Sequence, residues 1–325
     1  MPSNGSTGKL LQYVGVLIVA ISLNFMLPRL MPGNPLVLLA GVDVGLMTPE
    51  EREEIMEEVG LNRPLHEQYF SYLGDVFTGN FGYSYRQRRP IMDMILERLP
   101  WTLLLALSSL AFSSIVGIIL GAISAWRRGS FFDLALLNTM ITVDALPPFW
   151  IGMLGISIFA VRFGLVPSQG AITPASGYEG LEYVRDVIAH AILPVVTLSI
   201  ISTPRIFLTM RYTMIGLVGE DFIRTARSKG LTERFILLRH MIPNALIPVV
   251  TVLALRIGYA FGGTVVIETV FSYPGLGRLI FEAVSGRDYP VMQAAFLLFT
   301  IAVLASNLFA DWLYPKLDPR ARRIG

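Results

Sequence analysis

Long apolar stretches alternate with shorter polar segments along this chain. A helix needs about 20 consecutive apolar residues to cross the hydrocarbon core of a bilayer. Six stretches reach that length, so we expect membrane-spanning helices at approximately 10–30, 101–125, 134–163, 188–210, 247–271 and 291–313. The pattern predicts an all-α, polytopic membrane protein.

The first and third stretches are not simple straight spans. Stretch 10–30 has a long apolar run and no small-residue cleavage site before Pro32, so we expect a retained span and not a signal peptide. Stretch 134–163 is too long for one straight crossing and contains Pro147 and Pro148. Because proline interrupts helical hydrogen bonding, we expect a kink or a break there, with two separate helices as the alternative.

Composition supports the membrane class and excludes several others. The 325 residues are 53% hydrophobic and 15% charged, with a mean hydropathy of +0.59, whereas about 25% of an ordinary soluble domain is charged. With 26 basic and 24 acidic residues the net charge is +2, which is too balanced to indicate nucleic acid binding. The chain has no cysteine, which excludes disulfides, thiolate catalysis and cysteine metal sites.

Basic residues gather in particular loops. Arg127 and Arg128 follow the second span, five further Lys and Arg residues lie in the segment 220–243, and four follow the sixth span. Because short loops rich in Lys and Arg stay in the cytoplasm, we expect these regions and both termini to be cytoplasmic. The predicted divisions are 1–30 for the N-terminus and first span, 31–100 for an extracytoplasmic loop or cap, and 101–325 for the transmembrane domain.

The sequence contains no pattern typical of a catalytic or metal site. His66, His190 and His240 fall in different regions, and no His or Glu spacing suits a metal. The P-loop motif GxxxxGK[ST] is missing, so the chain is not expected to bind ATP through such a loop. Serines crowd the second span without a histidine or lysine base nearby, which argues against an intramembrane protease. We therefore predict neither a catalytic residue nor a bound metal.

Small residues and charges inside the spans carry different information. Gly117 with Gly121, and Gly258 with Gly262, have the four-residue spacing that lets helices pack closely. Charged residues inside a bilayer are costly and mark functional sites by default. Three of them lie within or beside the predicted spans and are candidates for the translocation path: Asp144, Arg256 and Glu268. A structural ion pair between Asp144 and Arg256 is the alternative, and the two roles are compatible.

The segment 220–243, EDFIRTARSKGLTERFILLRHMIP, is a polar, helix-prone excursion between two apolar stretches. Acidic Glu220 and Asp221 suit a helix start, and Gly230 interrupts helical propensity, so we expect two short helices that meet at a bend. Pro243 is expected to break the second helix before the fifth span.

The second helix of this segment is predicted to be amphipathic, with an apolar face that consists of Leu231, Phe235, Leu238 and Ile242. Such a helix at a membrane surface suits either a docking site for another protein or a contact with anionic lipid.

The same segment resembles the signature of the inner-membrane permeases of ATP-binding-cassette importers, in the branch that handles peptides, nickel, opines and some oligosaccharides. That signature is E-A-A, three residues, G, nine residues, then I-x-L-P. Onto it fall Arg224, Thr225, Ala226, Gly230, His240, Ile242 and Pro243, with arginine in place of the glutamate and histidine in place of the first isoleucine. RTARSKGL is similar to the usual form in this branch.

The resemblance extends along nearly the whole chain. GNFGYSYRQRRPIMDMILERLPWTLLLAL from Gly79, GLVPSQG from Gly164, VVIETVFSYPGLGRLIFEAVSGRDYPV from Val265 and DWLYPKLDPRARR from Asp311 resemble that branch in the correct order. Asn80 and Phe81 stand where Asp and Leu are commoner. Asp144 and Arg256 also depart from the small or neutral residues expected there, and we expect solute preference to depend on them.

The resemblance implies a six-span subunit of the type I importer architecture in the inner membrane of a prokaryote. Its implied partners are a homologous second permease, two cytoplasmic ATPases and an extracytoplasmic solute-binding protein. It implies no cofactor in this chain, since ATP and Mg would be bound by the partner ATPases. The implied coupling residues are Glu220, Arg224, Thr225, Ala226, Gly230, Phe235, Leu238, Ile242 and Pro243.

Peptides are the first expectation for the solute, and oligosaccharides, opines or nickel chelates are the alternatives. A more distant alternative is an ion-coupled secondary transporter in which Asp144, Arg256 and Glu268 form a relay. That class has no need of the Gly230 segment, and no inverted repeat is apparent. A membrane enzyme is disfavoured by the missing nucleophile and base.

Overall fold

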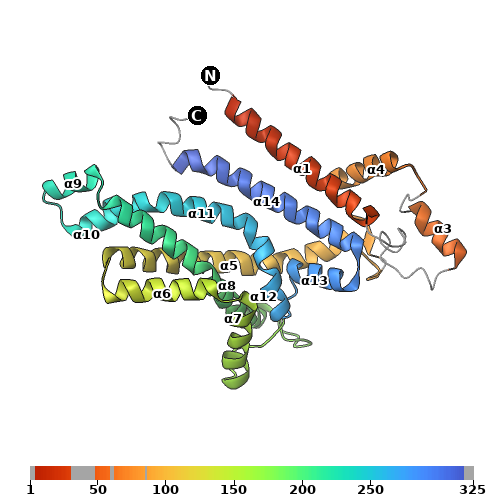
Figure 1. Ribbon diagram of the computed structural model, residues 1–325. Coiled ribbons are helices and arrows are strands. Elements are labelled where there is room, and N and C mark those ends of the chain that lie inside the picture. The colour runs from red at the N-terminus through yellow and green to blue at the C-terminus, as the bar shows by residue number, and fades with distance from the viewer. Residues whose placement is uncertain (1–3, 31–47, 59–61, 85, 318–325) are drawn as a thin grey trace. The chain divides into compact units, whose positions relative to one another are not determined.

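The part of the chain that the structure describes is mostly helical. The computed structural model describes residues 4–30, 48–58, 62–84 and 86–317 (Figure 1). The elements are α1 (Asn4–Leu30), α3 (Pro49–Glu58), α4 (Leu65–Thr78), β1 (Tyr83–Ser84), β2 (Arg89–Pro90), α5 (Ile91–Trp126), α6 (Phe131–Ala145), α7 (Pro148–Gly155), η2 (Ile156–Arg162), α8 (Gly180–Leu217), α9 (Asp221–Ser228), α10 (Glu233–Ile236), η3 (Leu237–Met241), α11 (Ile242–Gly263), α12 (Val265–Val270), α13 (Leu276–Gly286) and α14 (Tyr289–Leu317). Among the described residues the only strands are the two-residue antiparallel pair β1 and β2, and the predicted all-α class is confirmed.

Several of these helices are long and apolar enough to cross a bilayer. Within the described part of the chain they are Ile91–Trp126, Gly180–Leu217, Glu233–Arg256 and Tyr289–Trp312. A fifth span results if the bent pair α6 and α7–η2 is taken together. The predicted first span falls in α1, whose described apolar part, Leu11–Met26, is shorter.

The predicted break at Pro147 and Pro148 is confirmed. α6 ends at Ala145, α7 begins at Pro148, and the two helical parts are bent by 101°. Leu146 precedes a proline and is extended, with φ −81° and ψ 138°, which is the conformation that the following ring favours. Pro148 occupies the first helical turn, where its missing N–H removes no helical hydrogen bond. The fifth stretch is also interrupted, because α11 ends at Gly263 and α12 begins at Val265.

The chain divides into two compact units, and α5 and α14 each contribute to both. The first unit contains Met1–Thr102 and Pro274–Leu304. In its core the start of α5 packs on α13 and α14 through buried Ile91, Leu279 and Val291, among others.

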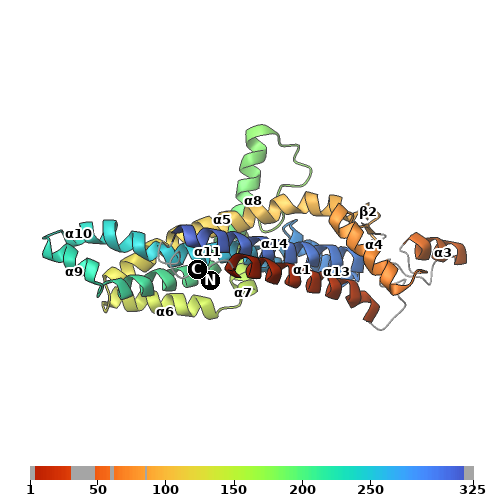
Figure 2. The same ribbon diagram turned by 90° about the horizontal axis from the view of Figure 1, so that it is seen from above.

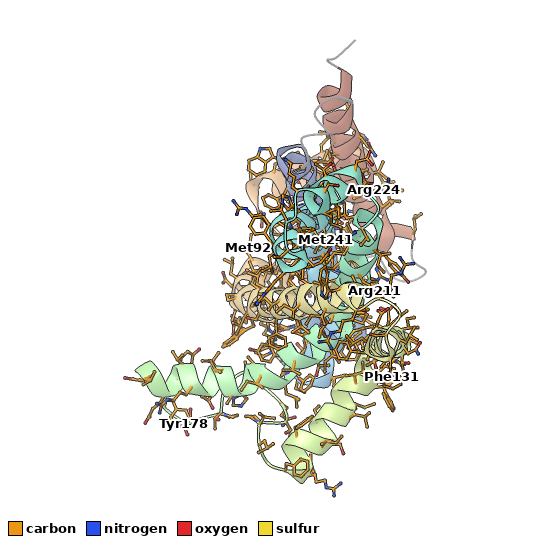
Figure 3. The ribbon with its side chains drawn as sticks, turned by 90° about the vertical axis from the view of Figure 1, so that its left-hand side faces the viewer. Met92, Phe131, Tyr178, Arg211, Arg224 and Met241 are labelled. Atoms are coloured by element: carbon orange, nitrogen blue, oxygen red, sulfur yellow. The ribbon has the colours of Figure 1, made fainter. Side chains whose placement is uncertain are left out.

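The second unit contains Leu103–Tyr273 and Ala305–Gly325. Here α5 packs closely on α8. A Cβ at Gly121 would lie 2.7 Å from the Phe207 carbonyl oxygen and 2.8 Å from the Met210 Cβ, so this glycine allows the two backbones to approach, as its spacing predicted. Gly258 and Gly262 lie where side-chain surroundings are not described. Figure 2 shows the first part of α8 turned away from α6 and α11, and Figure 3 shows Tyr178 beside it.

Candidate coupling site

The segment 220–243 forms two helices that meet at a bend, as predicted; the first, α9, is short, and the second begins with α10 and continues into η3 and α11. α9 begins after Glu220, which is extended (φ −70°, ψ 147°), and Asp221 lies in its first turn, where a carboxylate complements the helix dipole. α10 begins after Thr232, whose hydroxyl accepts a hydrogen bond from the Phe235 N–H at 3.4 Å. Residues of the segment itself therefore determine where both helices begin.

The bend between the two helices is a Schellman turn centred on Gly230. The Gly230 N–H donates to the Arg227 carbonyl at 2.9 Å, and the Leu231 N–H donates to the Ala226 carbonyl at 3.3 Å. Gly230 has φ +74°, a left-handed conformation that L side chains rarely adopt. Nothing lies within 4 Å of where its Cβ would stand. The glycine is therefore required by the backbone conformation and not by lack of space.

An ion pair braces the bend from outside. Arg227 Nε donates to Glu233 Oε1 at 2.8 Å, and its Nη2 donates to Oε2 at 3.2 Å. This bidentate contact joins the last turn of α9 to the first turn of α10, and the hydrogen bonds that Arg227 donates to the Glu233 carboxylate raise the pKa of Arg227. The pair is exposed, so it contributes little to the free energy of unfolding. Its main effect is to fix the angle between α9 and α10.

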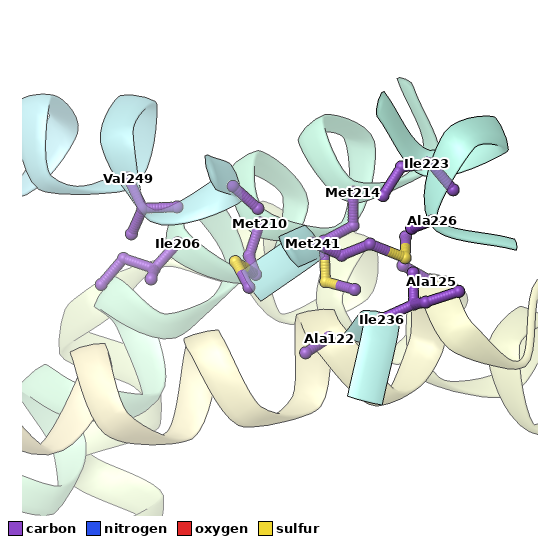
Figure 4. Close-up of a cluster of buried hydrophobic side chains, with 11 residues drawn as sticks. Ala122, Ala125, Ile206, Met210, Met214, Ile223, Ala226, Ile236, Met241 and Val249 are labelled. Carbon is purple, nitrogen blue, oxygen red and sulfur yellow. The ribbon is translucent and has the colours of Figure 1, made fainter. Parts of the chain in front are cut away.

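One face of the segment is part of the protein core. Ile223 and Ala226 of α9, together with Ile236 and Met241, are buried against Ala122 and Ala125 of α5 and Met210 and Met214 of α8 (Figure 4). We call this cluster the coupling core; it also contains Ile206, Ala245 and Val249. The inner side of the segment therefore packs directly against α5 and α8.

The other face is open. Phe235 and Leu238 are 48% and 57% exposed, and Leu231 is 36% exposed. Arg224 and Thr225 are exposed as well, and Figure 3 places Arg224 on the outside of the segment and Met241 inside it. We call Leu231, Phe235 and Leu238 the apolar tip.

The structure shows the burial of two predicted coupling residues and corrects one predicted feature, the helix break at Pro243. Ala226 is buried at 5% exposure, and Ile242 is partly buried and packed against the coupling core, so both lie on the inner side of the segment. Pro243 does not break the helix: α10, η3 and α11 follow one another without a gap from Glu233 to Gly263. The five residues of η3 form a π-helix just before the proline, and the wider turn accommodates the ring and the missing N–H.

The three predicted path residues have different surroundings. Arg256 is half-buried in α11, and its Nη1 donates to the Ser202 carbonyl of α8 at 3.3 Å. Asp144 is exposed at the end of α6, and no ion pair within 4 Å joins it to Arg256 among the described residues, although the two charges are close enough to influence each other. Glu268 is fully buried in α12. The structure therefore brings Asp144 and Arg256 into one neighbourhood without a direct contact.

A further buried ion pair was missed by the sequence reasoning. Arg211 of α8 donates through Nε and Nη2 to the two carboxylate oxygens of Asp133 in α6, at 2.7 and 2.9 Å. Asp133 directly precedes one predicted apolar stretch and Arg211 directly follows another, so both were placed outside the spans. The sequence feature that could have indicated the pair is an acidic residue at the boundary of one apolar stretch and a basic residue at the boundary of another.

Within the described ranges, no three His, Cys, Asp or Glu side chains come together in a way that could hold a metal ion. The site consists instead of a bundle of membrane-crossing helices and a braced helix pair that presents an exposed apolar tip. These features are those of a multi-pass membrane protein with an exposed apolar surface on a fixed support.

Comparison with known proteins agrees with that class. The model of the family "binding-protein-dependent transport system inner membrane component" matches residues 117–323, and the model of its N-terminal part matches residues 8–106. The chain therefore belongs to this family. It is a transport subunit and a multi-pass membrane protein.

Curated relatives cover nearly the whole chain. It is 35% identical over 317 residues to the dipeptide transport system permease protein DppB of Escherichia coli K12, covering 92% of this chain and 93% of the relative. Its identity to the di/tripeptide permease DppB of Pseudomonas aeruginosa is 35% over 314 residues, covering 92% and 93%. The glutathione permease GsiC of E. coli K12 is also 35% identical over 314 residues, covering 97% of both chains.

Solved structures share the fold. An inward-facing structure of the MetNI methionine ABC transporter aligns with a TM-score of 0.54 at 18% identity, covering 70% of this chain and 98% of that chain. An amino acid ABC transporter crystallised with histidines aligns with a TM-score of 0.53 at 16% identity, covering 69% and 94%. The predicted ABC importer permease architecture is confirmed.

Proposed function

We propose that this chain is a permease subunit of an ATP-driven importer that moves peptides across the cytoplasmic membrane by alternating access. The family membership supports the transport role, and the relatives named for dipeptides, di/tripeptides and glutathione support a peptide as the solute. Oligosaccharides, opines and nickel chelates are the competing solutes in the same kind of machinery.

The exposed apolar tip is the observation that carries the mechanism. Phe235 and Leu238 project from a helix pair fixed by the Gly230 turn and the ion pair between Arg227 and Glu233. An exposed apolar pair on a rigid support is suited to a groove in a soluble protein. We assign this surface to a cytoplasmic ATPase, which binds ATP and Mg and carries out hydrolysis, while this chain holds no cofactor.

The continuous helix from α10 into α11 provides the lever. Displacement of the apolar tip would be transmitted directly to α11, because no break separates Glu233 from Gly263. α11 carries Arg256, and Asp144 lies in the same neighbourhood. Motion of the lever would therefore change the surroundings of the charges that we assign to the translocation path, with Glu268 of α12 as the third.

The complete importer requires further subunits. We assign to it a homologous second permease that forms the path together with this chain, two ATPases, and an extracytoplasmic binding protein that delivers the solute. The Lys and Arg distribution supports cytoplasmic termini in the inner membrane of a prokaryote. The segment 220–243 is then on the same side as the ATPases.

The docking role can be tested with Phe235→Ala combined with Leu238→Ala. In the reconstituted complex this variant should still insert into the membrane but lose most binding of the ATPase subunits and most solute-stimulated ATP hydrolysis. Phe131→Ala is the matched control, since Phe131 is 88% exposed at the start of α6 and outside the segment. Equal ATPase binding by the two variants would refute the docking assignment.

The solute and the energy source can be tested in proteoliposomes with the cognate binding protein. Uptake of a labelled dipeptide should require internal ATP, stop with vanadate and continue after proton and sodium gradients are collapsed. Uptake of an oligosaccharide, an opine or a nickel chelate by the same complex, with no uptake of any peptide tested, would replace the peptide assignment. Uptake that follows the ion gradient without ATP would instead support a secondary transporter.

A further inference from the structure

Asp133 and Arg211 form a buried polar cluster in which both charges have partners. Besides its two bonds from Arg211, the Asp133 carboxylate accepts from the Gly129 N–H at 2.9 Å and from the Ser124 hydroxyl. Arg211 Nε also contacts the Ser124 hydroxyl oxygen at 3.1 Å. The side chain of Asp133 is 1% exposed and that of Arg211 is 9% exposed. The cluster thus joins the end of α5, the turn that follows it, the start of α6, and α8.

A buried ion pair of this kind is a poor means of gaining stability. Removing two charges from water costs about as much as their attraction returns, and an apolar pair of similar volume often stabilises a fold equally well. Directional hydrogen bonds do fix position, because Asp133 accepts bonds from three separate parts of the chain. The pair is therefore better explained by the geometry that it imposes.

The cluster shares helical turns with the coupling core. Ser124 lies between Ala122 and Ala125 of α5, and Arg211 lies between Met210 and Met214 of α8, all four of which belong to that core. The face of α9 and α10 that moves with the apolar tip therefore packs on the same turns of α5 and α8 that hold Asp133. α6 contributes no residue to the buried coupling core. The ion pair between Asp133 and Arg211 therefore connects α6 to the turns of α5 and α8 that form this core.

We propose that the Asp133–Arg211 ion pair is a clamp that makes α6 move together with α8 and the coupling core. Asp133 and Arg211 are positioning residues and do not contact the solute. Asp144 lies at the opposite end of α6 from Asp133, so a clamped α6 carries the displacement of the coupling segment to the Asp144 side of the path. This inference rests on the proposed coupling function.

The test measures whether α6 and α11 move as one body. The chain has no cysteine, so Asn138→Cys on α6 and Asn244→Cys on α11, both exposed, can carry spin labels without background. Distances between the labels are measured in the reconstituted complex without nucleotide and with trapped ATP. The native pair is compared with Asp133→Leu combined with Arg211→Met, which replaces both charges by apolar side chains so that the fold is kept.

The native clamp should give one narrow distance distribution that is the same in both nucleotide states. The apolar double variant should keep its melting temperature within a few degrees but give a distribution that is broadened or that differs between the two states. It should also transport at least severalfold less solute per ATP hydrolysed. A narrow, nucleotide-independent distribution and normal transport in the double variant would overturn the clamp and leave the ion pair with a structural role.

Failure of the clamp and failure of the proposed function are distinguishable. If the coupling function is wrong, the unlabelled protein with its native pair will not show solute-stimulated ATP hydrolysis at all. If only the clamp is wrong, that activity will be present and the double variant will equal it. Should the double variant fail to fold, the single change Arg211→Lys, which keeps the charge but loses the bidentate contact, gives the same comparison, and an unchanged distance distribution would again refute the clamp.

Discussion

Substitution of Gly230 offers the sharpest test of the coupling segment, because the free-energy cost of a side chain there can be worked out from the backbone conformation alone. Its φ of +74° is left-handed, and no atom lies within 4 Å of the position of a Cβ. A substitution there meets no neighbouring atom, so its effect is the conformational cost of the side chain itself. For an L residue this cost is about 1–2 kcal/mol, and Asn tolerates the conformation better. Since 1.4 kcal/mol is about a factor of ten in an equilibrium constant, Gly230→Ala should lower the equilibrium constant for forming the native turn about tenfold.

The order of three variants is the prediction. Gly230→Asn should be nearest to the native protein, Gly230→Ala intermediate, and Gly230→Val worst, because a β-branched residue is a true outlier at positive φ. All three should reach the membrane, since the turn lies outside the coupling core. The assay is solute-stimulated ATP hydrolysis by the reconstituted complex over a range of ATPase concentrations. Normal stimulation by the Val variant, or an Asn variant as defective as the Val variant, would refute the reasoning.

Three further predictions follow from the membrane part. Gly121→Ala should lower the free energy of unfolding by about 1–3 kcal/mol, as overpacking does, because its Cβ would lie 2.7 Å from the Phe207 carbonyl oxygen. The control is Gly216→Ala, which should not destabilise the protein, since nothing lies within 4 Å of its Cβ position. Equal melting temperatures of the two variants would contradict the prediction. Asp133→Ala alone should destabilise by about 3–5 kcal/mol, because it leaves the Arg211 charge buried without its partner, as thermal unfolding in detergent would show. Arg256→Ala should change solute affinity or selectivity in uptake assays; unchanged uptake of every solute tested with a lowered melting temperature would assign Arg256 a structural role.

The sequence was informative wherever a local pattern determined the structure. The helical class follows from long apolar stretches that strands or loops do not produce. The break after Ala145 follows from two adjacent prolines, whose restriction acts on their immediate neighbours. The Gly230 bend follows from a glycine at a helix end, where a left-handed residue is required. Each of these is a short-range effect.

The sequence was less informative where distant contacts decide. Ala226 and Ile242 point inward because α5 and α8 supply the surface that they cover, and a helix as short as α10 has too little periodicity to show which face is buried. Pro243 is accommodated by a π-turn, which depends on hydrogen-bond geometry that residue types do not specify. Asp133 and Arg211 are 78 residues apart along the chain, so only the packing of α6 on α8 reveals them as a pair.

The two faces of the coupling segment separate stability from coupling. Changes on the inner face, such as Ile236→Ala or Met241→Ala, remove fully buried side chains and should destabilise by about 2–5 kcal/mol. Changes on the apolar tip expose no core and should leave stability unchanged while weakening ATPase binding. Force from a partner on the tip reaches α5 and α8 through the coupling core, and reaches α11 through the helix that continues from α10. A variant of the inner face that kept full stability yet lost coupling would therefore indicate that the core transmits movement as well as holding the segment in place.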